Sequence, residues 1–248
     1  LDADTTISMQ SFDAAMYAAG GAIAAVDAVM KGEAKNAFVA ARPPGHHAPP
    51  DQAMGFCLFN NIAIAARHAQ RRGLARVMIV DFDVHHGNGT QDVFVNDPSV
   101  LFVSYHQHGI YPLTGGVDET GVGNICNLPL PEGSGADAFL RLADEVVAPL
   151  ARRFAPDLLL VSAGYDAHWR DPLAGLQMTI GGFQALSGRL RAIAHESCTH
   201  RVGFVLEGGY DLEALGAGVV ASLYGLTGAQ DSAPDPLGPA PRPEPAID

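Results

Sequence analysis

Short apolar runs alternate along the chain with longer amphipathic stretches. The apolar runs are continuous, which is typical of parallel strands covered by helices on both faces. They predict strands over 37–40, 77–80, 100–103, 158–161 and 202–206. Helical periodicity between these runs predicts helices over 12–31, 58–72, 88–96, 136–153, 180–195 and 211–226. This alternation predicts a single α/β domain with a mostly parallel central sheet flanked by helices on both faces.

The pattern stops near the end of the chain. Beyond Gly228 prolines recur at short intervals, at Pro234, Pro236, Pro239, Pro241, Pro243 and Pro245. Such spacing prevents helices and sheet ladders. We therefore divide the chain into one domain over 1–227 and an extended or disordered tail over 228–248, and we regard a proline-rich ligand for a partner domain as the less favoured interpretation.

Composition excludes some partners. The formal net charge of −12 argues against a nucleic-acid-binding surface, which needs clustered basic residues. Cys57, Cys126 and Cys198 form no CxxC pair, which indicates reduced thiols and a cytoplasmic location. We identify no apolar run near the roughly 20 residues that span a bilayer and no signal peptide at the first residues, so we expect no membrane association. Oligomeric state stays open, with a homo-oligomer possible.

A polar cluster follows each expected strand. These clusters lie at 42–47, 81–89, 104–106, 162–168 and 207–211, and they are rich in His, Asp and Tyr. In open α/β sheets, ligands bind beyond the carboxyl ends of the strands. Their convergence at one edge therefore predicts a functional site, since packing alone does not explain it.

Two of these clusters suggest a metal site. Asp83 and His85 are two residues apart, so on an extended segment both project to the same side. Asp166 arrives from another strand end and supplies a third ligand. Each residue alone also fits an ordinary loop or cap, but an Asp-His-Asp set with an open position suits one catalytic Zn²⁺, with iron(II) as the alternative.

Acid–base candidates flank this set. His46 and His47 follow the turn Pro43-Pro44-Gly45, and imidazole exchanges protons near neutrality. Asp81 and Asn88 are the natural orienting partners. A carboxylate raises the pKa of its histidine more than an amide does, which leaves the other ring freer to act as a base.

Tyr210 is a candidate for stabilising an oxyanion. It follows Gly208 and Gly209, which allow the backbone to approach a ligand closely. Its hydroxyl can donate a hydrogen bond to developing negative charge. Taken alone, the residue is better explained as a core tyrosine with a satisfied hydroxyl.

The segments RPPGHHA, GFCLFNN, DFDVHHGNGTQ, SAGYDAH, DPLAG and EGGYD resemble the histone deacetylase superfamily. The likeness runs from 1 to 226 and is strongest to class II-like and microbial members, which include acetylpolyamine amidohydrolases. It implies an arginase/deacetylase-like fold and a zinc-dependent hydrolase that removes acetyl groups from amines such as acetyl-lysine or acetylpolyamines. We expect a bacterial source, for which histones are not the natural substrate.

The resemblance also implies roles for individual residues. Asp83, His85 and Asp166 are similar to the zinc ligands, with one ion per chain. His46 and His47 are similar to the catalytic pair, with His47 as the general base, Asp81 as the partner of the first histidine and Tyr210 as the transition-state tyrosine. Asn88 is typical of class II-like members.

Further positions are implied by the same resemblance. The walls of a narrow substrate tunnel are assigned to Gly55, Phe56 and Tyr111, with Gly208 and Gly209 beside them. A structural K⁺ or Na⁺ is assigned to backbone around Asp81, Asp83 and His85, together with Ser104. Family members normally carry an N-terminal portion before the segment that matches Leu1, and its loop forms one rim of the pocket.

Two other functions are weighed against this interpretation. An arginase-type ureohydrolase binds two manganese ions and needs additional carboxylates, at positions where this chain has Gly87 and His168. A catalytically silent protein could instead bind acylated or cationic small ligands in the same pocket. The presence of His47 and Tyr210 favours the enzyme.

Overall fold

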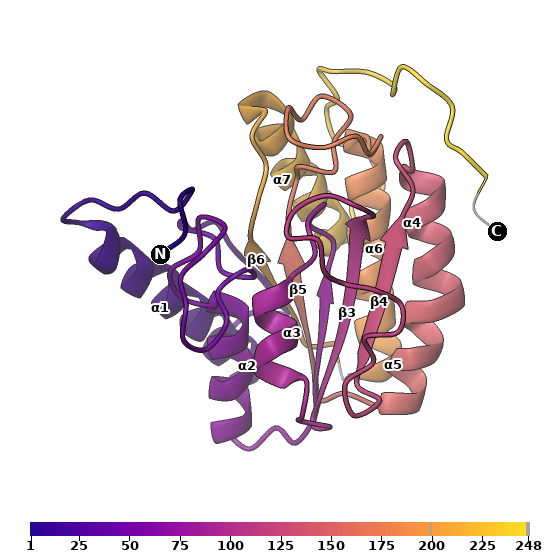
Figure 1. The fold of residues 1–248 in the computed structure, drawn as a ribbon. Coiled ribbons are helices and arrows are strands. Elements are labelled where there is room, and N and C mark those ends of the chain that lie inside the picture. The colour runs from indigo at the N-terminus through magenta and orange to yellow at the C-terminus, as the bar shows by residue number, and fades with distance from the viewer. Residues whose placement is uncertain (199, 247–248) are drawn as a thin grey trace.

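The computed structural model describes residues 1–198 and 200–246, and its centre is one sheet in which every neighbouring pair of strands is parallel (Figure 1). The strand order is β1-β6-β5-β2-β3-β4. The strands are β1 (Asn36–Val39), β2 (Val77–Asp81), β3 (Val100–Gln107), β4 (Ile125–Leu130), β5 (Leu158–Ala163) and β6 (Val202–Leu206). The predicted fold class is confirmed.

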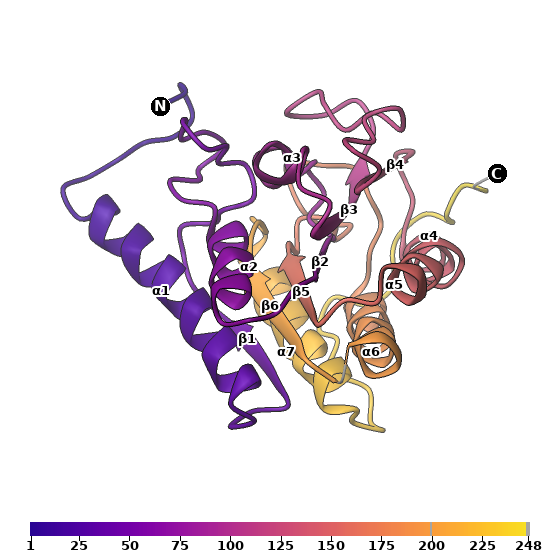
Figure 2. The same ribbon diagram turned by 90° about the horizontal axis from the view of Figure 1, so that it is seen from below.

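Helices cover both faces of the sheet, as the view from below shows (Figure 2). One face carries α1 (Ser11–Met30), α2 (Asn61–Arg71) and α3 (Asn88–Phe94). The other carries α4 (Ala136–Leu142), the π-helical turn η1 (Ala143–Val147), α5 (Ala148–Phe154), α6 (Ile180–Ser197) and α7 (Leu212–Thr227). The helix expected over 136–153 therefore contains a π-helical turn.

The apolar strands divide their side chains between two cores. In β2, Met78 and Val80 belong to the core beneath α4–α7, whereas Val77 and Ile79 belong to the core beneath α1–α3. All four side chains are completely buried. A strand buried on both faces has no polar side to alternate with, which explains why the sequence shows continuous apolar runs.

The edge strand β4 was not predicted. It carries Asn127 and Pro129 within Ile125–Leu130, so its sequence lacks an apolar run. Proline cannot donate to a ladder, but β4 pairs on one side only, with β3, and an edge tolerates this loss. Its partner β3 also extends beyond the predicted 100–103, through the polar residues at its end to Gln107.

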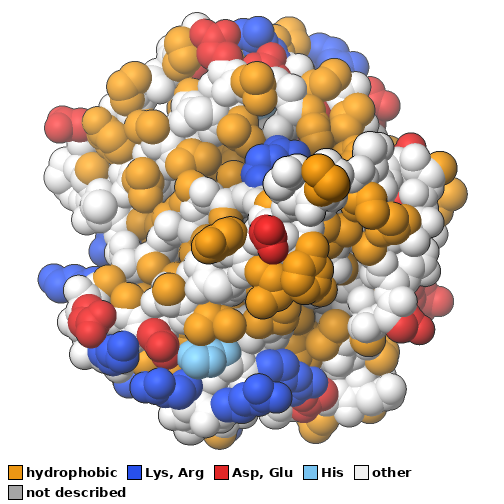
Figure 3. Space-filling view, turned by 90° about the vertical axis from the view of Figure 1, so that its left-hand side faces the viewer, with side chains coloured by type: hydrophobic (Ala, Val, Ile, Leu, Met, Phe, Trp, Pro, Cys, Tyr) orange, Lys and Arg blue, Asp and Glu red, His pale blue; other side chains and the backbone are white. Residues whose placement is uncertain are grey.

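From the sequence we identified no apolar run long enough to span a membrane, and this is wrong for α1 when only length and composition are considered. This helix is long and apolar enough to pass that test, because alanine fills much of it. One side of α1 packs against α2 and β1. Its opposite side exposes Met9 just before the helix and then Phe12, Met16 and Tyr17. Figure 3 shows hydrophobic side chains gathered on this face of the molecule.

The proline-rich tail runs over the body of the protein as an extended segment (Figure 1). Helix α7 ends at Thr227, and Gly228 caps it in the left-handed conformation. Near the other end, the carboxylate of Glu244 accepts hydrogen bonds from the backbone N–H groups of Gly135, Asp137 and Ala138 at the start of α4. The described part of the tail is therefore held against the domain. Residues 247–248 of the predicted tail lie outside the described residues.

Candidate active site

The site lies where the strand order reverses. From β2, the chain adds β3 and β4 on one side, whereas β5, β6 and β1 lie on the other. Loops that leave β2 and β5 therefore diverge and open a crevice at the carboxyl edge of the sheet. Asp81, the last residue of β2, lies in register with Ser104 of β3 and Ser162 of β5. The polar clusters that follow these strands thus meet at one point.

Asp83, His85 and Asp166 converge in this crevice. Their candidate ligand atoms all lie within 4.8 Å of one another. His85 Nδ1 lies 3.1 Å from Asp83 Oδ1 and 3.2 Å from Asp166 Oδ2. Burial, together with the charge of Asp83, raises the pKa of Asp166 to about 7. Two buried carboxylates beside one imidazole repel each other, and a divalent cation would relieve that repulsion.

The backbone around these carboxylates is built to hold them. Val84 N–H donates to Asp166 Oδ1 at 2.9 Å, and Gly208 N–H donates to Asp83 Oδ2 at 2.8 Å. A Cβ atom at Gly164 would overlap the Asp83 carboxylate, and one at Gly208 would overlap the carboxylates of both Asp83 and Asp166. Two carboxylates and one imidazole are ligands that zinc accepts in proteins. The backbone contacts fix the orientation of the carboxylates, so the three residues fit a zinc ion.

The neighbouring histidines have different partners, and their pKa values are shifted in opposite directions. His46 Nδ1 lies 3.0 Å from Asp81 Oδ2, and His47 Nδ1 lies 2.8 Å from Asn88 Oδ1. Burial by itself lowers the pKa of His46, but the charges of Asp83 and Asp81 raise it well above its usual value. Burial and the cationic His46 together hold the pKa of His47 well below its usual value.

These opposite shifts favour the protonated form at His46 and the neutral form at His47. Because Asn88 Oδ1 only accepts, His47 carries its proton on Nδ1 and keeps a lone pair on Nε2. A neutral imidazole with a free lone pair is suited to accept a proton from a reactant.

Glu207 supports the turn that carries these histidines, and sequence reasoning assigned it no role. Its Oε2 accepts from the backbone N–H groups of Gly45 and His46, at 2.6 and 3.1 Å. Ser162 Oγ donates to Oε1 at 3.0 Å. Burial raises the pKa of Glu207 to about 7. Its sequence signal was a carboxylate directly after a buried strand, at the start of EGGYD.

A narrow cavity of about 330 Å³ leads to the cluster. It is lined by Asp4, His47, Gly55, Phe56, His85, Tyr111, Leu173 and Tyr210. The ring centroids of Phe56 and Tyr210 are 5.8 Å apart, and those of His47 and Tyr111 are 5.0 Å apart. The structure thus brings together the residues expected in the tunnel wall and adds Asp4 and Leu173, which were not predicted. We call this cavity the tunnel.

The first residues of the chain hold one side of the tunnel mouth. Asp2 Oδ2 accepts from Gly55 N–H at 3.0 Å and from the Tyr111 hydroxyl at 3.4 Å. Phe56 N–H donates to Thr5 Oγ1 at 3.1 Å. This chain therefore supplies its own contacts to the rim that the resemblance assigns to an N-terminal loop.

Tyr210 enters the tunnel from the turn after β6. Its backbone N–H donates to Asp171 Oδ2 at 2.7 Å. Burial raises the pKa of the Tyr210 hydroxyl, so the group stays protonated and can donate. Gly208 and Gly209 are not among the residues that line the tunnel. Gly208 lies behind the carboxylates, and Gly209 adopts φ +131°, a left-handed geometry that favours glycine.

A second metal position is not supported. Among residues 1–198 and 200–246, Asp83, His85 and Asp166 form the one cluster of three metal-binding side chains. A Cβ atom at Gly87 would overlap the Asp81 carboxylate. His168 stacks on Phe183 and accepts from the backbone of Arg170. The two positions that a binuclear site needs therefore serve packing here.

Comparison with known proteins agrees with the fold and the site. The family described as the histone deacetylase domain matches residues 1–226, and the chain belongs to this family. A crystal structure of the HDA15 HD domain superposes with a TM-score of 0.86 and 39% identity, covering 94% of this chain and 67% of that one.

Curated relatives come from several kingdoms. The chain is 50% identical to "Histone deacetylase 10, chloroplastic" of Oryza sativa subsp. japonica, over 90% of this chain and 53% of the relative. It is 42% identical to the "Histone deacetylase-like amidohydrolase" of Pseudomonas aeruginosa, over 96% and 64%. A "Probable deacetylase" of Archaeoglobus fulgidus is also 42% identical, over 91% and 65%. The chain thus spans between half and two thirds of the length of these relatives.

Proposed function

We propose that the chain is a zinc-dependent amidohydrolase that removes acetyl or similar acyl groups from acylated amines such as acetyl-lysine or acetylpolyamines. One observation carries this proposal. A buried Asp-His-Asp cluster borders a narrow tunnel in which a neutral histidine and a protonated tyrosine face the same space. Membership of the histone deacetylase family supports a hydrolase of the deacetylase class.

A zinc ion held by Asp83, His85 and Asp166 would supply Lewis-acid chemistry, which lowers the pKa of a water molecule and polarises an acyl carbonyl. His47 Nε2 takes the proton of the attacking water, because His47 lines the tunnel and its Nδ1 is bound to Asn88. Tyr210 donates a hydrogen bond to the oxygen that becomes negative. A histidine returns a proton to the departing amine.

The lining of the tunnel supports the substrate class. Phe56 and Tyr111 provide aromatic walls for an unbranched alkyl amine, and Asp4 places a carboxylate among the lining residues. That carboxylate favours substrates that carry a second cationic group. A structural K⁺ or Na⁺ near Asp81 and Ser104 is also proposed, and its support is the register that puts these residues side by side.

The proposal is tested by hydrolysis of acetyl-lysine peptide, trifluoroacetyl-lysine peptide and acetylated polyamines. Each is measured with added Zn²⁺, with added Fe²⁺ and with a chelator. Metal-dependent turnover that Asp166→Ala abolishes, while Asp137→Ala on the surface of α4 retains it, supports the proposal. If a folded, metal-loaded chain leaves every substrate intact but still binds them, the protein is a silent binder and the proposal is wrong.

A further inference from the structure

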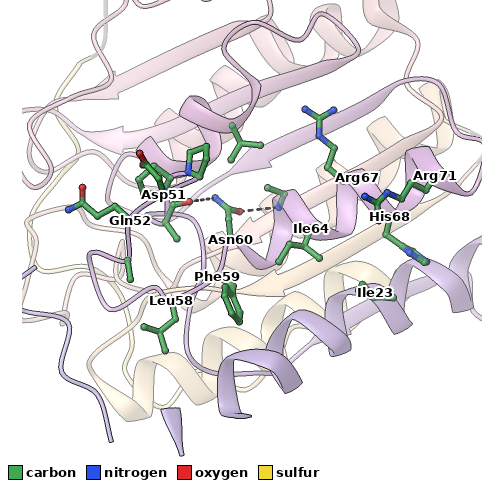
Figure 4. Close-up of a pocket in the computed structure, with 16 residues that line it drawn as sticks. Ile23, Asp51, Gln52, Leu58, Phe59, Asn60, Ile64, Arg67, His68 and Arg71 are labelled. Carbon is green, nitrogen blue, oxygen red and sulfur yellow. Dashed lines mark hydrogen bonds between the residues drawn. The ribbon is translucent and has the colours of Figure 1, made fainter. Parts of the chain in front are cut away.

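A second cavity lies outside the tunnel, between α1, α2 and the segment that follows His47. Its volume is about 610 Å³, which is within the range of ligand-binding pockets. The centre of its lining consists of partly buried apolar side chains, Ile23, Leu58, Phe59, Ile64 and Val93. Figure 4 shows Leu58, Phe59, Ile64 and Ile23 along the space between the two helices. We call this cavity the groove.

The two ends of the groove differ in charge. Asp51 and Gln52 lie at one end, whereas Arg67, His68 and Arg71 of α2 lie toward the other (Figure 4). The basic end is unusual for a chain with 15 Lys and Arg against 27 Asp and Glu. Basic residues in the last turn of a helix also complement its dipole, and this accounts for their presence but not for the apolar groove beside them.

The groove cations differ in how they are paired. Arg67 forms an ion pair with Asp97, and its guanidinium lies 4.6 Å from the centroid of the Phe94 ring, so it is held in place. His68 Nε2 lies 2.8 Å from Asp27 Oδ1. Within the described part of the chain, Arg71 has no ion pair, and its side chain is exposed at the lip of the groove. Arg71 is therefore available to an anionic ligand.

We propose that the groove binds a small carboxylic acid with an unbranched apolar chain. The apolar chain packs against Phe59 and Ile64, and the carboxylate reaches Arg71. A guanidinium recognises a carboxylate through two parallel N–H groups, which an alcohol or an ammonium group cannot replace. The proposed site concerns binding alone and does not depend on the proposed hydrolysis.

The groove is separated from the tunnel by one folded segment. Gly55 and Phe56 line the tunnel, whereas Pro49, Leu58 and Phe59 line the groove. Asn60 fixes this segment, because its side-chain Nδ2 donates to the carbonyl oxygen of Ala48 and to Thr90 Oγ1, each at 3.2 Å. A ligand in the groove therefore makes its own contacts, and variants on the two sides of the segment distinguish the two locations.

The test is titration of the full chain with octanoate, by calorimetry and in the presence of a chelator. Octanol lacks the carboxylate and acetate lacks the apolar chain, so both should bind more weakly than octanoate. Arg71→Gln should weaken octanoate about tenfold, the range of a charged hydrogen bond, and should leave octanol unchanged. Arg153→Gln, an exposed arginine in the last turn of α5, is the matched control and should change neither.

Two further variants locate the ligand. Leu58→Asn should weaken octanoate and octanol alike, because it makes the apolar wall polar. Phe56→Ala, on the tunnel side, should leave octanoate binding unchanged. Thermal unfolding checks that each variant is folded. Equal octanoate affinity in the wild type and Arg71→Gln would overturn the proposal, as would loss of binding in Phe56→Ala with retention in Leu58→Asn.

Discussion

The tunnel and the groove lie on either side of the same segment, yet they are lined in different ways. The groove is the larger, at about 610 Å³ against about 330 Å³. Its charged groups lie at an accessible lip. The tunnel ends at His47 and His85, beside carboxylates that are completely buried.

This difference separates the proposed site for chemistry from the proposed site for binding. Volume describes what a cavity can hold, whereas buried groups with displaced pKa values mark where protons and metal ions are handled. Burial of Asp83 and Asp166 has a large desolvation cost, which the fold offsets with backbone donors and His85. The groove contains no such arrangement among its described residues.

The largest expected effect compares one carboxylate from each cavity. Asp166→Asn keeps the size of the side chain but removes a charged ligand, so turnover should fall by about 10³ or more and zinc content should drop. Asp51→Asn at the groove should stay within about twofold of the wild type. Elemental analysis and reporter hydrolysis measure both. Zinc binding that survives Asp166→Asn unchanged would remove this residue from the metal site.

Aromatic residues provide the next comparison. Tyr210→Phe removes only the hydroxyl, so zinc content should persist while turnover falls by about 10²–10³, as for other oxyanion donors. Phe59→Leu in the groove should leave turnover nearly unchanged, with a small loss of stability. The measurement is the turnover rate of each variant and of the wild type at saturating substrate. A Tyr210→Phe protein at the wild-type rate would exclude the tyrosine from the mechanism.

A buried histidine outside both cavities tests whether a displaced pKa by itself marks a catalytic group. His106 donates to the carbonyl oxygen of Gly115 at 3.0 Å, and burial lowers its pKa to about 4 from an ordinary value near 6.5. The folded state therefore binds this proton less readily than the unfolded state does. The stabilisation is complete above about pH 6.5 and is lost as pH falls toward 4, by about 3 kcal/mol.

Urea unfolding at several pH values measures this contribution. His106→Gln should show a shallower decline of unfolding free energy between pH 6.5 and 4, whereas the exposed His108→Gln should follow the wild type. Turnover of His106→Gln at pH 7.5 should stay close to normal. An unchanged decline in His106→Gln would show that other groups dominate acid unfolding.

The smallest expected effect concerns the tunnel mouth. Asp4 is exposed, so its charge is screened by solvent. Asp4→Asn should raise KM for cationic acetylpolyamines about two- to fivefold and leave neutral acyl amides unchanged. The ratio of kcat/KM for the two substrates, at low and high salt, provides the measurement. An equal change for both substrates would indicate a structural role instead.

Most of the fold was predictable because buried parallel strands leave a simple signal. The predicted apolar runs correspond to β1, β2, β3, β5 and β6. Strand β4 was not predicted, because its extended conformation depends on pairing with β3. Its own sequence, which includes Pro129, contains no sign of that pairing. An edge strand is specified by its neighbour as much as by its residues.

The candidate site divides in the same way. Asp83, His85 and Asp166 could be proposed because their spacing and their position after strands are visible in the sequence. Glu207, Asp4 and Leu173 acquire their places from contacts between distant segments. The groove could not be predicted from the sequence either, since α1 and the segment after His47 form it only when they pack together.

The register of β2 against β5 has a consequence for folding. Asp81 pairs with Ser162, and His85 meets Asp166 across 81 residues of sequence. A slip of one residue would turn Asp81 to the opposite side of the sheet and put an apolar neighbour in its place. Such distant parallel pairing forms slowly. Recovery of activity during refolding therefore reports correct alignment of these two strands, and not the formation of either strand alone.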